Sequence, residues 1–528
     1  MAKEPMLKFV GTGQSYPSKR AAELRAEDFR EIADRYAAPD AEAQASRCSQ
    51  CGVPYCSVHC PLHNHIPDWL RLTAEGRLRE AYELSNATST MPEICGRICP
   101  QDRLCEGNCV IEFSGHGAVT IGSVEKYITD TAWAEGWVEP LRPGRALGAS
   151  VGVIGAGPAG LTAAEYLRVA GYEVHVYDRH DRAGGLLTYG IPGFKLEKGV
   201  VMRRVARLEE GGIVFHLGAD VGGALLFAEL RARHDALLVA TGVYKPRGIR
   251  VPIFRPPFRG EVAGEAGRRG VTGGEWNSSA DTPPPPLRGG PPPLPGEDVH
   301  GIVEALDYLI ASNRKGFGDV VPAFDNGVLN AEGKHVVVIG GGDTAMDCVR
   351  TAIRQGAASV KCLYRRDRAN MPGSQREVAN AEEEGVEFIW LSAPEAFEAD
   401  ESGQVTAVRA SRMRLGAPDA SGRRAPEPEP DSGFRLDADL VVKALGFDPE
   451  DLPALFNTRE LGVTRWGTLR IDHKSMMTSL DGVFAAGDIV RGASLVVWGI
   501  RDGRDVAEKM HAWLKAKTIA EELEREAA

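Results

Sequence analysis

The spacing of hydrophobic positions changes near residue 150 and divides the chain into two parts. Over residues 68–84 and 123–137, apolar side chains recur at helical spacing between polar loops, so residues 1–148 are predicted to be helical. From residue 150 onward, short apolar runs of strand length alternate with longer helical patterns. This alternation is typical of α/β folds in which helices cover a parallel sheet.

Residues 252–295 interrupt the alternating pattern. They are rich in proline, glycine and arginine around the run PPPPLRGGPPPLP. Such chain buries too little apolar surface to offset the entropy lost on ordering, and we therefore predict a disordered insertion. The strand and helix pattern resumes at Val299 and continues to the last residues.

The first α/β unit carries the glycine pattern of a dinucleotide-binding turn. The strand predicted over residues 150–154 runs into GAGPAG and then into a helix from Leu161. The first glycine permits a tight turn, the second a close backbone approach to pyrophosphate, and the third close packing of helix on strand. The next strand, 173–177, ends at Asp178, which can accept a ribose hydroxyl. The turn residues expected to contact the nucleotide are Gly155, Gly157, Pro158, Ala159 and Gly160.

A second unit repeats this plan with one change. A strand at 334–339 leads into a glycine-rich turn, and the helix after the turn continues through Gln355. The following strand, 359–364, ends in Arg365 and Arg366, where an acid would repel a 2′-phosphate and a guanidinium binds one, so NADP is favoured over NAD. A solvated surface turn is the alternative for the two arginines. The expected turn contacts are Gly340, Gly341, Gly342, Asp343, Thr344 and Ala345.

A return of the chain to the first unit indicates which nucleotide binds where. A strand at 482–486 is followed by Gly487 and Asp488, as in flavoproteins whose second nucleotide domain is inserted in the first. The segments 240–242 and 444–446 fit the two crossovers. FAD is therefore expected at the first turn and NADPH at the second. Further expected FAD contacts are Gly185, Leu186, Thr241 and Gly242.

Eight of the ten cysteines lie between Cys48 and Cys109, which indicates metal binding rather than disulfides. Two short arrays of four cysteines with nearby prolines match two 4Fe–4S clusters, although their order does not settle which cysteines share a cluster. Two structural zinc sites are the alternative, and nearby His59, His63 and His65 are interpreted as solvent-facing loop residues. The arrays are Cys48, Cys51, Cys56 and Cys60, then Cys95, Cys99, Cys105 and Cys109.

Bulk properties exclude several classes of function. The length of 528 residues exceeds one hydrophobic core and indicates several domains. A net charge of −11 argues against nucleic acid or an anionic membrane as the partner. No apolar run is long enough for a membrane span, and the first residues lack the apolar core of a signal peptide, so a cytoplasmic location is expected.

The segments CSQCGVPYCSVHCP, PEICGRICPQDRLCEGNC, GGLLTYGIPGFKLEK and GGGDTAMDCVRTAIRQGA together resemble the small (beta) subunit family of bacterial NADPH-dependent glutamate synthase. The same module is similar to the N-terminal half of dihydropyrimidine dehydrogenase. The resemblance implies a chain that passes electrons from NADPH through FAD and two 4Fe–4S clusters to a large (alpha) subunit. That subunit, with FMN and a 3Fe–4S cluster, makes glutamate from glutamine and 2-oxoglutarate.

The resemblance also implies the ligand sets. Cys48, Cys51, Cys56 and Cys109 would hold one cluster. Cys60, Cys99 and Cys105 would hold the other, with either Cys95 or Glu125 as the fourth ligand. No acid–base catalytic residue is expected, because hydride passes between cofactors.

The implied layout has four segments. Residues 1–148 form the cluster domain, 149–325 the first part of the FAD domain including the insertion, 326–475 the NADPH domain, and 476–528 the second part of the FAD domain. Two alternatives stay open. One is a related flavin and iron–sulfur subunit serving a pyrimidine reductase or a ferredoxin-linked transhydrogenase, and the other is a zinc-containing binding module.

Overall fold

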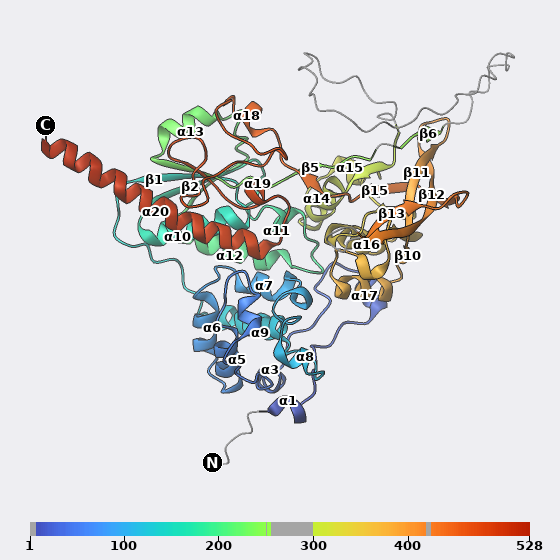
Figure 1. Cartoon of the computed structure of the whole chain (residues 1–528), viewed down its shortest axis with the longest axis horizontal. Coiled ribbons are helices and arrows are strands. Elements are labelled where there is room, and N and C mark those ends of the chain that lie inside the picture. The colour runs from blue at the N-terminus through green and yellow to red at the C-terminus, as the bar shows by residue number, and fades with distance from the viewer. Residues whose placement is uncertain (1–6, 250, 255–298, 419–423, 528) are drawn as a thin grey trace.

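The computed structural model describes residues 7–249, 251–254, 299–418 and 424–527, which form three parts arranged around a common centre (Figure 1). The first part is helical, as the sequence predicts. Its core packs around Trp69, Val124 and Ile128. Its helices are α1 (Lys8–Gly11), α2 (Ala22–Ala26), α3 (Ala38–Ala45), α4 (Tyr55–Val58), α5 (Ile66–Ala74), α6 (Leu78–Asn86), α7 (Pro92–Ile98), η1 (Gln101–Arg103), α8 (Val110–Phe113) and α9 (Ile121–Ala134).

Two helical predictions in this part have different outcomes. The pattern over 123–137 corresponds to α9, so that prediction is confirmed. The single helix expected over 68–84 is wrong, because the chain breaks between α5 and α6. Gly76 lies at this break with a φ of 73°, a left-handed conformation that glycine adopts without strain.

The second part is built on a parallel five-stranded sheet of order β17-β4-β1-β2-β3. Helices lie on both faces of this sheet, so its central strand is almost wholly buried. The strands are β1 (Ser150–Ile154), β2 (Glu173–Asp178), β3 (Val214–Leu217), β4 (Ala236–Val239) and β17 (Val483–Ala485). The helices are α10 (Pro158–Ala170), α11 (Leu186–Tyr189), α12 (Lys198–Glu210), α13 (Phe227–Arg233), α18 (Leu452–Leu455), α19 (Asp488–Arg491) and α20 (Val496–Ala527).

The third part repeats the architecture with a parallel sheet of order β10-β9-β8-β15-β7. The strands are β7 (Ile302–Glu304), β8 (His335–Ile339), β9 (Ser359–Leu363), β10 (Glu387–Ile389) and β15 (Leu440–Lys443). Its helices are α14 (Ala305–Gly316), α15 (Pro322–Asp325), α16 (Asp343–Arg354), η2 (Arg368–Asn370) and α17 (Gln375–Glu383). The expected α/β fold with two Rossmann-like domains behind a helical domain is confirmed.

Two smaller sheets complete the chain. One has order β13-β12-β11-β6, with β14 paired to β12. Its strands are β6 (Ile253–Phe254), β11 (Ser392–Ala399), β12 (Val405–Pro418), β13 (Arg424–Pro428) and β14 (Phe434–Asp437). The other is an antiparallel ribbon of β5 (Lys245–Pro246) and β16 (Phe447–Asp448), in which the two crossovers between the nucleotide-binding parts lie side by side.

The chain enters and leaves the inserted part earlier than expected. β7 and the segment before it already belong to the second α/β unit, so the expected start at residue 326 is too late. The chain is back in the first unit by Leu452, which packs with Ile154 and Tyr177, so the expected return at residue 476 is also too late. Both boundaries involve strands of two or three residues, which are too short to show a periodic pattern.

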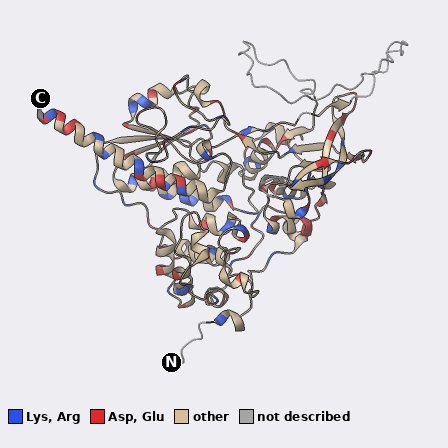
Figure 2. Cartoon of the chain, in the orientation of Figure 1, with Lys and Arg blue, Asp and Glu red and all other residues tan. Residues whose placement is uncertain are grey.

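The insertion expected over 252–295 lies outside the described residues from position 255 onward. Its first residues behave otherwise than predicted, because Ile253 and Phe254 pair in parallel with β11. Within the described ranges, no helix has both the length and the hydropathy that crossing a bilayer requires. Basic and acidic side chains are interspersed over all three parts (Figure 2).

A buried ion pair joins the helical part to the first nucleotide-binding part. Arg204 of α12 donates two hydrogen bonds to the Glu93 carboxylate of α7, at 2.7 and 2.8 Å, and the two side chains are 1% and 0% exposed. Such a pair contributes little net stability, but removing one partner leaves an uncompensated buried charge.

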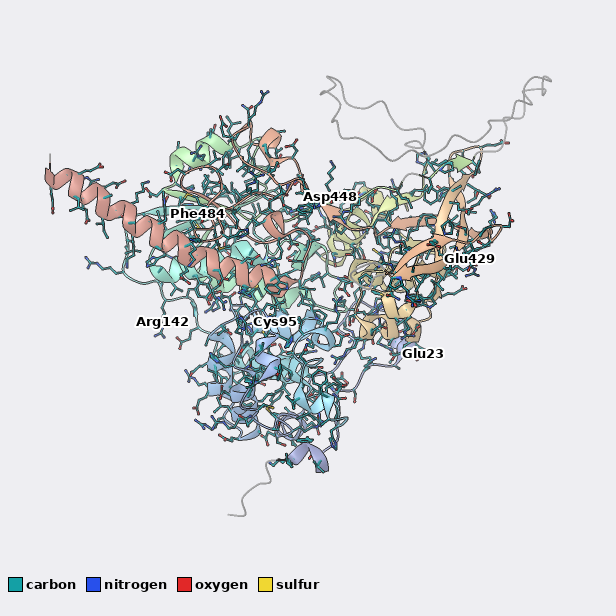
Figure 3. All side chains as sticks on the ribbon, in the orientation of Figure 1. Glu23, Cys95, Arg142, Glu429, Asp448 and Phe484 are labelled. Carbon is teal, nitrogen blue, oxygen red and sulfur yellow. The ribbon has the colours of Figure 1, made fainter. Side chains whose placement is uncertain are left out.

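We expect Arg204→Met to destabilise the protein by about 3 kcal/mol and to lower its thermal midpoint by about 5 °C. Scanning calorimetry or thermal melting by circular dichroism measures this. The matched control is Arg142→Met, since the pair between Arg142 and Glu139 is exposed and should contribute almost nothing (Figure 3). Equal midpoints for the two variants would contradict the importance of the buried pair.

Candidate cofactor and electron-transfer sites

The turn after β1 is shaped by contacts that only glycine permits. A Cβ on Gly155 would lie 2.4 Å from the Ala240 carbonyl oxygen, and one on Gly160 would lie 2.0 Å from the Gly155 carbonyl oxygen. Gly157, between them, faces open space with no atom within 4 Å of a built Cβ. The turn therefore packs tightly against the sheet and leaves room on its outer side, as a pyrophosphate site requires.

Asp178 at the end of β2 is held by the same turn. Its carboxylate accepts hydrogen bonds from the Ala156 N–H at 2.8 Å and the His180 N–H at 2.9 Å. Burial raises the pKa of Asp178, but the bonds from His180 and Ala156 outweigh it and hold that pKa below its ordinary value. A fixed, ionised acceptor at this place suits a ribose hydroxyl.

A cavity opens beside this carboxylate, lined by Gly155, Asp178, Thr241 and Tyr244 among others. The Thr241 hydroxyl is buried and has no hydrogen-bond partner among the described residues. A buried hydroxyl without a partner is costly, so the cavity suits a ligand that carries polar groups. Gly242 follows Thr241 with a φ of 74°.

The remaining residues expected at the first site gather around the start of α10, which Pro158 begins. A Cβ on Gly185 would lie 2.9 Å from the Gly157 Cα, and one on Gly487 would lie 2.9 Å from the Ala159 Cβ. Asp488 begins α19 and accepts a hydrogen bond from the Ser494 hydroxyl at 2.6 Å. The structure thus brings the return segment onto the first turn, as the sequence predicts.

The turn after β8 has the same construction. A Cβ on Gly340 would lie 2.3 Å from the Ala444 carbonyl oxygen, and one on Gly341 would lie 2.4 Å from the Tyr364 ring. Gly342 faces open space. Asp343, Thr344 and Ala345 then form the first turn of α16, with Ala345 buried.

Arg365 and Arg366 follow β9 in a bend beside this turn. Arg365 is exposed, whereas Arg366 is half-buried and its Nε is enclosed without a hydrogen-bond partner. Across the described part of the chain, neither arginine forms an ion pair with a carboxylate. Their charges are therefore available to an anionic ligand.

The eight clustered cysteines line two separate cavities. Cys48, Cys51, Cys56 and Cys109 surround one of them. Cys60, Cys95, Cys99 and Cys105 surround the other, together with Glu125. This is the grouping that the family resemblance implies, and Cys95 and Glu125 both remain candidates for the fourth position of the second set. Cys95 lies where the helical part meets the first nucleotide-binding part (Figure 3).

The thiols are desolvated, which determines what can bind them. Burial raises the pKa of Cys48 to about 12 and those of Cys56 and Cys60 to about 11. Burial also raises the pKa of the Glu125 carboxyl, and the nearby Cys95 raises it further. Thiolates form in such surroundings when cationic iron compensates their charge, and four cysteines around one cavity match the ligand number of a 4Fe–4S cluster.

No three of the described histidine, cysteine or acidic side chains meet closely enough to hold a single metal ion. His59, His63 and His65 are exposed, as expected for loop histidines.

A large cleft, of about 560 Å³, lies where the three parts meet. The helical part contributes Cys99 and Gln101 to its wall, and the second nucleotide-binding part contributes Asp343 and Thr344. Leu186 and the start of α20 line it from the first nucleotide-binding part. Cys99, Gln101 and Val497 also line the second cysteine cavity, so the cleft and that cavity share a wall.

Sequence reasoning missed part of this wall. The segment Leu495–Val497 belongs to no recognised motif, although the run SLVVW that contains it begins six positions after Asp488. Gln101 also belongs to no motif. Its place in the shared wall depends on how α7 folds against α9.

Three families match parts of this chain. Residues 25–137 match dihydropyrimidine dehydrogenase domain II with its 4Fe–4S cluster. Residues 153–204 match the NAD(P)-binding Rossmann-like domain, and residues 288–506 match the pyridine nucleotide-disulphide oxidoreductases. The helical domain and both α/β units thus have counterparts in known families.

Individual proteins are similar over almost the whole chain. The NADPH glutamate synthase small chain of Azospirillum brasilense is 62% identical over 520 residues, which cover 98% of each chain. That of Escherichia coli K12 is 42% identical over 96% of this chain and 98% of its own.

A solved structure, Mycobacterium tuberculosis FprA in complex with NADPH, is similar in fold. It has a TM-score of 0.50 and 19% identity over 72% of this chain and 87% of its own.

We expect Gly160→Ala to weaken FAD binding by about tenfold, because the added methyl group would force α10 away from the turn. Equilibrium dialysis with FAD, or flavin absorbance per chain after purification, measures this. Gly199→Ala is the matched control, since Gly199 lies in the first turn of α12 with open space around it. Unchanged FAD binding by the Gly160 variant would place the flavin elsewhere.

Proposed function

Because this chain belongs to the family of the NADPH glutamate synthase small chain, we propose that it is the electron-input chain of such an enzyme. It oxidises NADPH and delivers the electrons to a large chain that makes L-glutamate from L-glutamine and 2-oxoglutarate. The observation that carries this proposal is the wall shared by the central cleft and the second cysteine cavity. A redox group in the cleft would lie next to one held by the cysteines.

FAD, when bound, takes hydride from NADPH, and 4Fe–4S clusters pass electrons on singly. The unpartnered Thr241 hydroxyl and the open face of Gly157 are the observations that fit FAD at the first turn. The residues that would hold it are Gly155, Gly157, Pro158, Ala159, Gly160, Asp178, Gly185, Leu186, Thr241, Gly242, Gly487 and Asp488.

The second turn fits NADPH for the corresponding reasons. The backbone N–H groups at the start of α16 would donate hydrogen bonds to the pyrophosphate, and Arg365 and Arg366 would donate hydrogen bonds to the 2′-phosphate. The residues that would hold it are Gly340, Gly341, Gly342, Asp343, Thr344, Ala345, Arg365 and Arg366.

The two cysteine cavities fit two 4Fe–4S clusters, held by the sets Cys48, Cys51, Cys56 and Cys109, and Cys60, Cys99 and Cys105 with Cys95 or Glu125. The second cavity borders the cleft, and the first lies farther out, beside the exposed side chains of Tyr55 and Val110. Electrons leaving the cleft would therefore reach the second cavity before the first.

The role of the protein in hydride transfer is alignment. Leu186, Ile191 and Val497 give the cleft an apolar lining, which limits water around the reacting groups. The three parts of the chain together fix the relative position of the two nucleotides. No side chain is assigned an acid–base role.

The proposed partner is the large (alpha) chain, with FMN and a 3Fe–4S cluster, and the proposed location is the cytoplasm. Support comes from the small-chain relatives, which match this chain end to end. A relative named putative oxidoreductase AegA, from Escherichia coli K12, is 43% identical, but the match covers only 70% of its length. The length match favours the glutamate synthase partner.

We expect Arg365→Ala/Arg366→Ala to lower the ratio of kcat/KM for NADPH over NADH by about a hundredfold, because two charge-assisted contacts to the 2′-phosphate are lost. Steady-state reduction of an artificial acceptor with each nucleotide measures the two kcat/KM values. Arg368→Ala is a nearby control, since Arg368 already pairs with Glu382. An unchanged preference for NADPH over NADH would contradict the assignment of the two arginines to the 2′-phosphate. They would then be interpreted as a solvated surface turn.

The experiment that tests the proposed function is an anaerobic visible spectrum of the purified chain, with iron, sulfide and zinc analysis, before and after NADPH addition. We expect flavin bands over an iron–sulfur shoulder, about eight irons per chain, and bleaching by NADPH. A colourless chain that contains zinc would overturn the electron-input function.

A further inference from the structure

The loop between two cysteines of the second cavity reaches across to the second nucleotide-binding part. Arg103 in this loop donates a hydrogen bond to the Pro372 carbonyl oxygen, and its other terminal nitrogen lies 3.4 Å from a carboxylate oxygen of Asp343. Beside it, Asp102 accepts a hydrogen bond from the Ser374 hydroxyl at 3.2 Å. Residues far apart in sequence thus meet at the start of α16.

Asp343 occupies a sensitive position in this contact. It is the first residue of α16, directly after Gly342, whose open face leaves the room that a pyrophosphate would take. One of its carboxylate oxygens accepts the Ser374 N–H at 2.9 Å, and the other faces Arg103. An uncompensated carboxylate here would repel an incoming pyrophosphate.

Arg103 is the cation paired with Asp343 within the described part of the chain. Lys195 also lies close enough to interact electrostatically with Asp343. However, the Lys195 ammonium is already 3.0 Å from Asp347 and 3.6 Å from Glu377. Compensation of the Asp343 charge therefore falls mainly to Arg103.

We propose that Arg103 of the helical domain is a positioning residue of the NADPH site, which neutralises Asp343 so that the pyrophosphate of NADPH can dock at the start of α16. The inference rests on the proposed function, because it takes the second turn as the NADPH site. It adds a residue from a third domain to a site that the sequence motif confines to one.

Arg103 lies between two cysteines of the second cavity. The loop that carries it is anchored at Cys99 and at Cys105, both of which line the second cysteine cavity. Arg103 thus connects a loop that borders this cavity to the start of α16.

The test uses equilibrium titration of the intact, anaerobically purified chain with two fragments of NADP. Adenosine 2′,5′-bisphosphate carries one phosphate of the pyrophosphate, whereas adenosine 2′-monophosphate carries none. We expect Arg103→Ala to weaken binding of the bisphosphate by about fivefold and to change binding of the monophosphate less than about twofold, because the pair is partly exposed and screened. Arg103→Lys should retain most of the affinity.

The variant Asp343→Asn tests whether Arg103 acts by neutralising the Asp343 charge. In Asp343→Asn the charge to be neutralised is gone, while the side-chain oxygen still accepts the Ser374 N–H. Adding Arg103→Ala to this variant should therefore cost little affinity for the bisphosphate. Asp343→Asn alone should tighten bisphosphate binding, and this holds as a test even if Arg103→Ala does not fold. The control is Arg79→Ala, whose exposed pair with Glu83 lies on α6 of the same domain.

Different outcomes test the role of Arg103 and the proposed function separately. Equal bisphosphate affinity of Arg103→Ala and the unsubstituted chain overturns the role of Arg103, as does an equal loss for both fragments. A loss that persists in the Asp343→Asn background also overturns charge neutralisation. If the unsubstituted chain binds neither fragment, the second turn is not the NADPH site and the proposed function fails instead.

Discussion

Buried ion pairs lie where the three parts of this chain meet, and they restrict how the parts can be arranged. Arg204 and Glu93 join the helical part to the first nucleotide-binding part. On the other side, Arg350 and Glu384 form a fully buried pair at 2.8 Å, and Arg25 of the N-terminal segment reaches the same glutamate at 3.5 Å. Such pairs add little net stability but tolerate few alternative arrangements, since any mismatch leaves a buried charge unpaired.

Much of the fold could be predicted because each nucleotide unit contains its own local signals. The first strand was predicted at its observed bounds, since a buried parallel strand is a continuous apolar run that ends at a glycine turn. The boundaries of the inserted part were missed because β7 and β16 are too short to show a period. The helix expected over 68–84 failed for a related reason, since one glycine outweighed an otherwise helical pattern.

The candidate sites divide in the same way. Glycines, Asp178 and the two arginines stand at fixed offsets from strands, so sequence alone located them. The grouping of the cysteines is not readable from their order, because it depends on how α7 and α9 pack and on where Cys109 returns. Arg103 could not be found from any motif, because its partner is 240 positions away and belongs to a different domain.

The two strands that connect the inserted part to the rest of the chain restrict how it can move. A domain on a single tether can swivel about it, but here Pro246 pairs with Phe447 and Lys245 with Asp448. Swivelling would break the pairing of this ladder. The paired connections therefore oppose twisting of the inserted part relative to the rest of the chain more strongly than a single connection would.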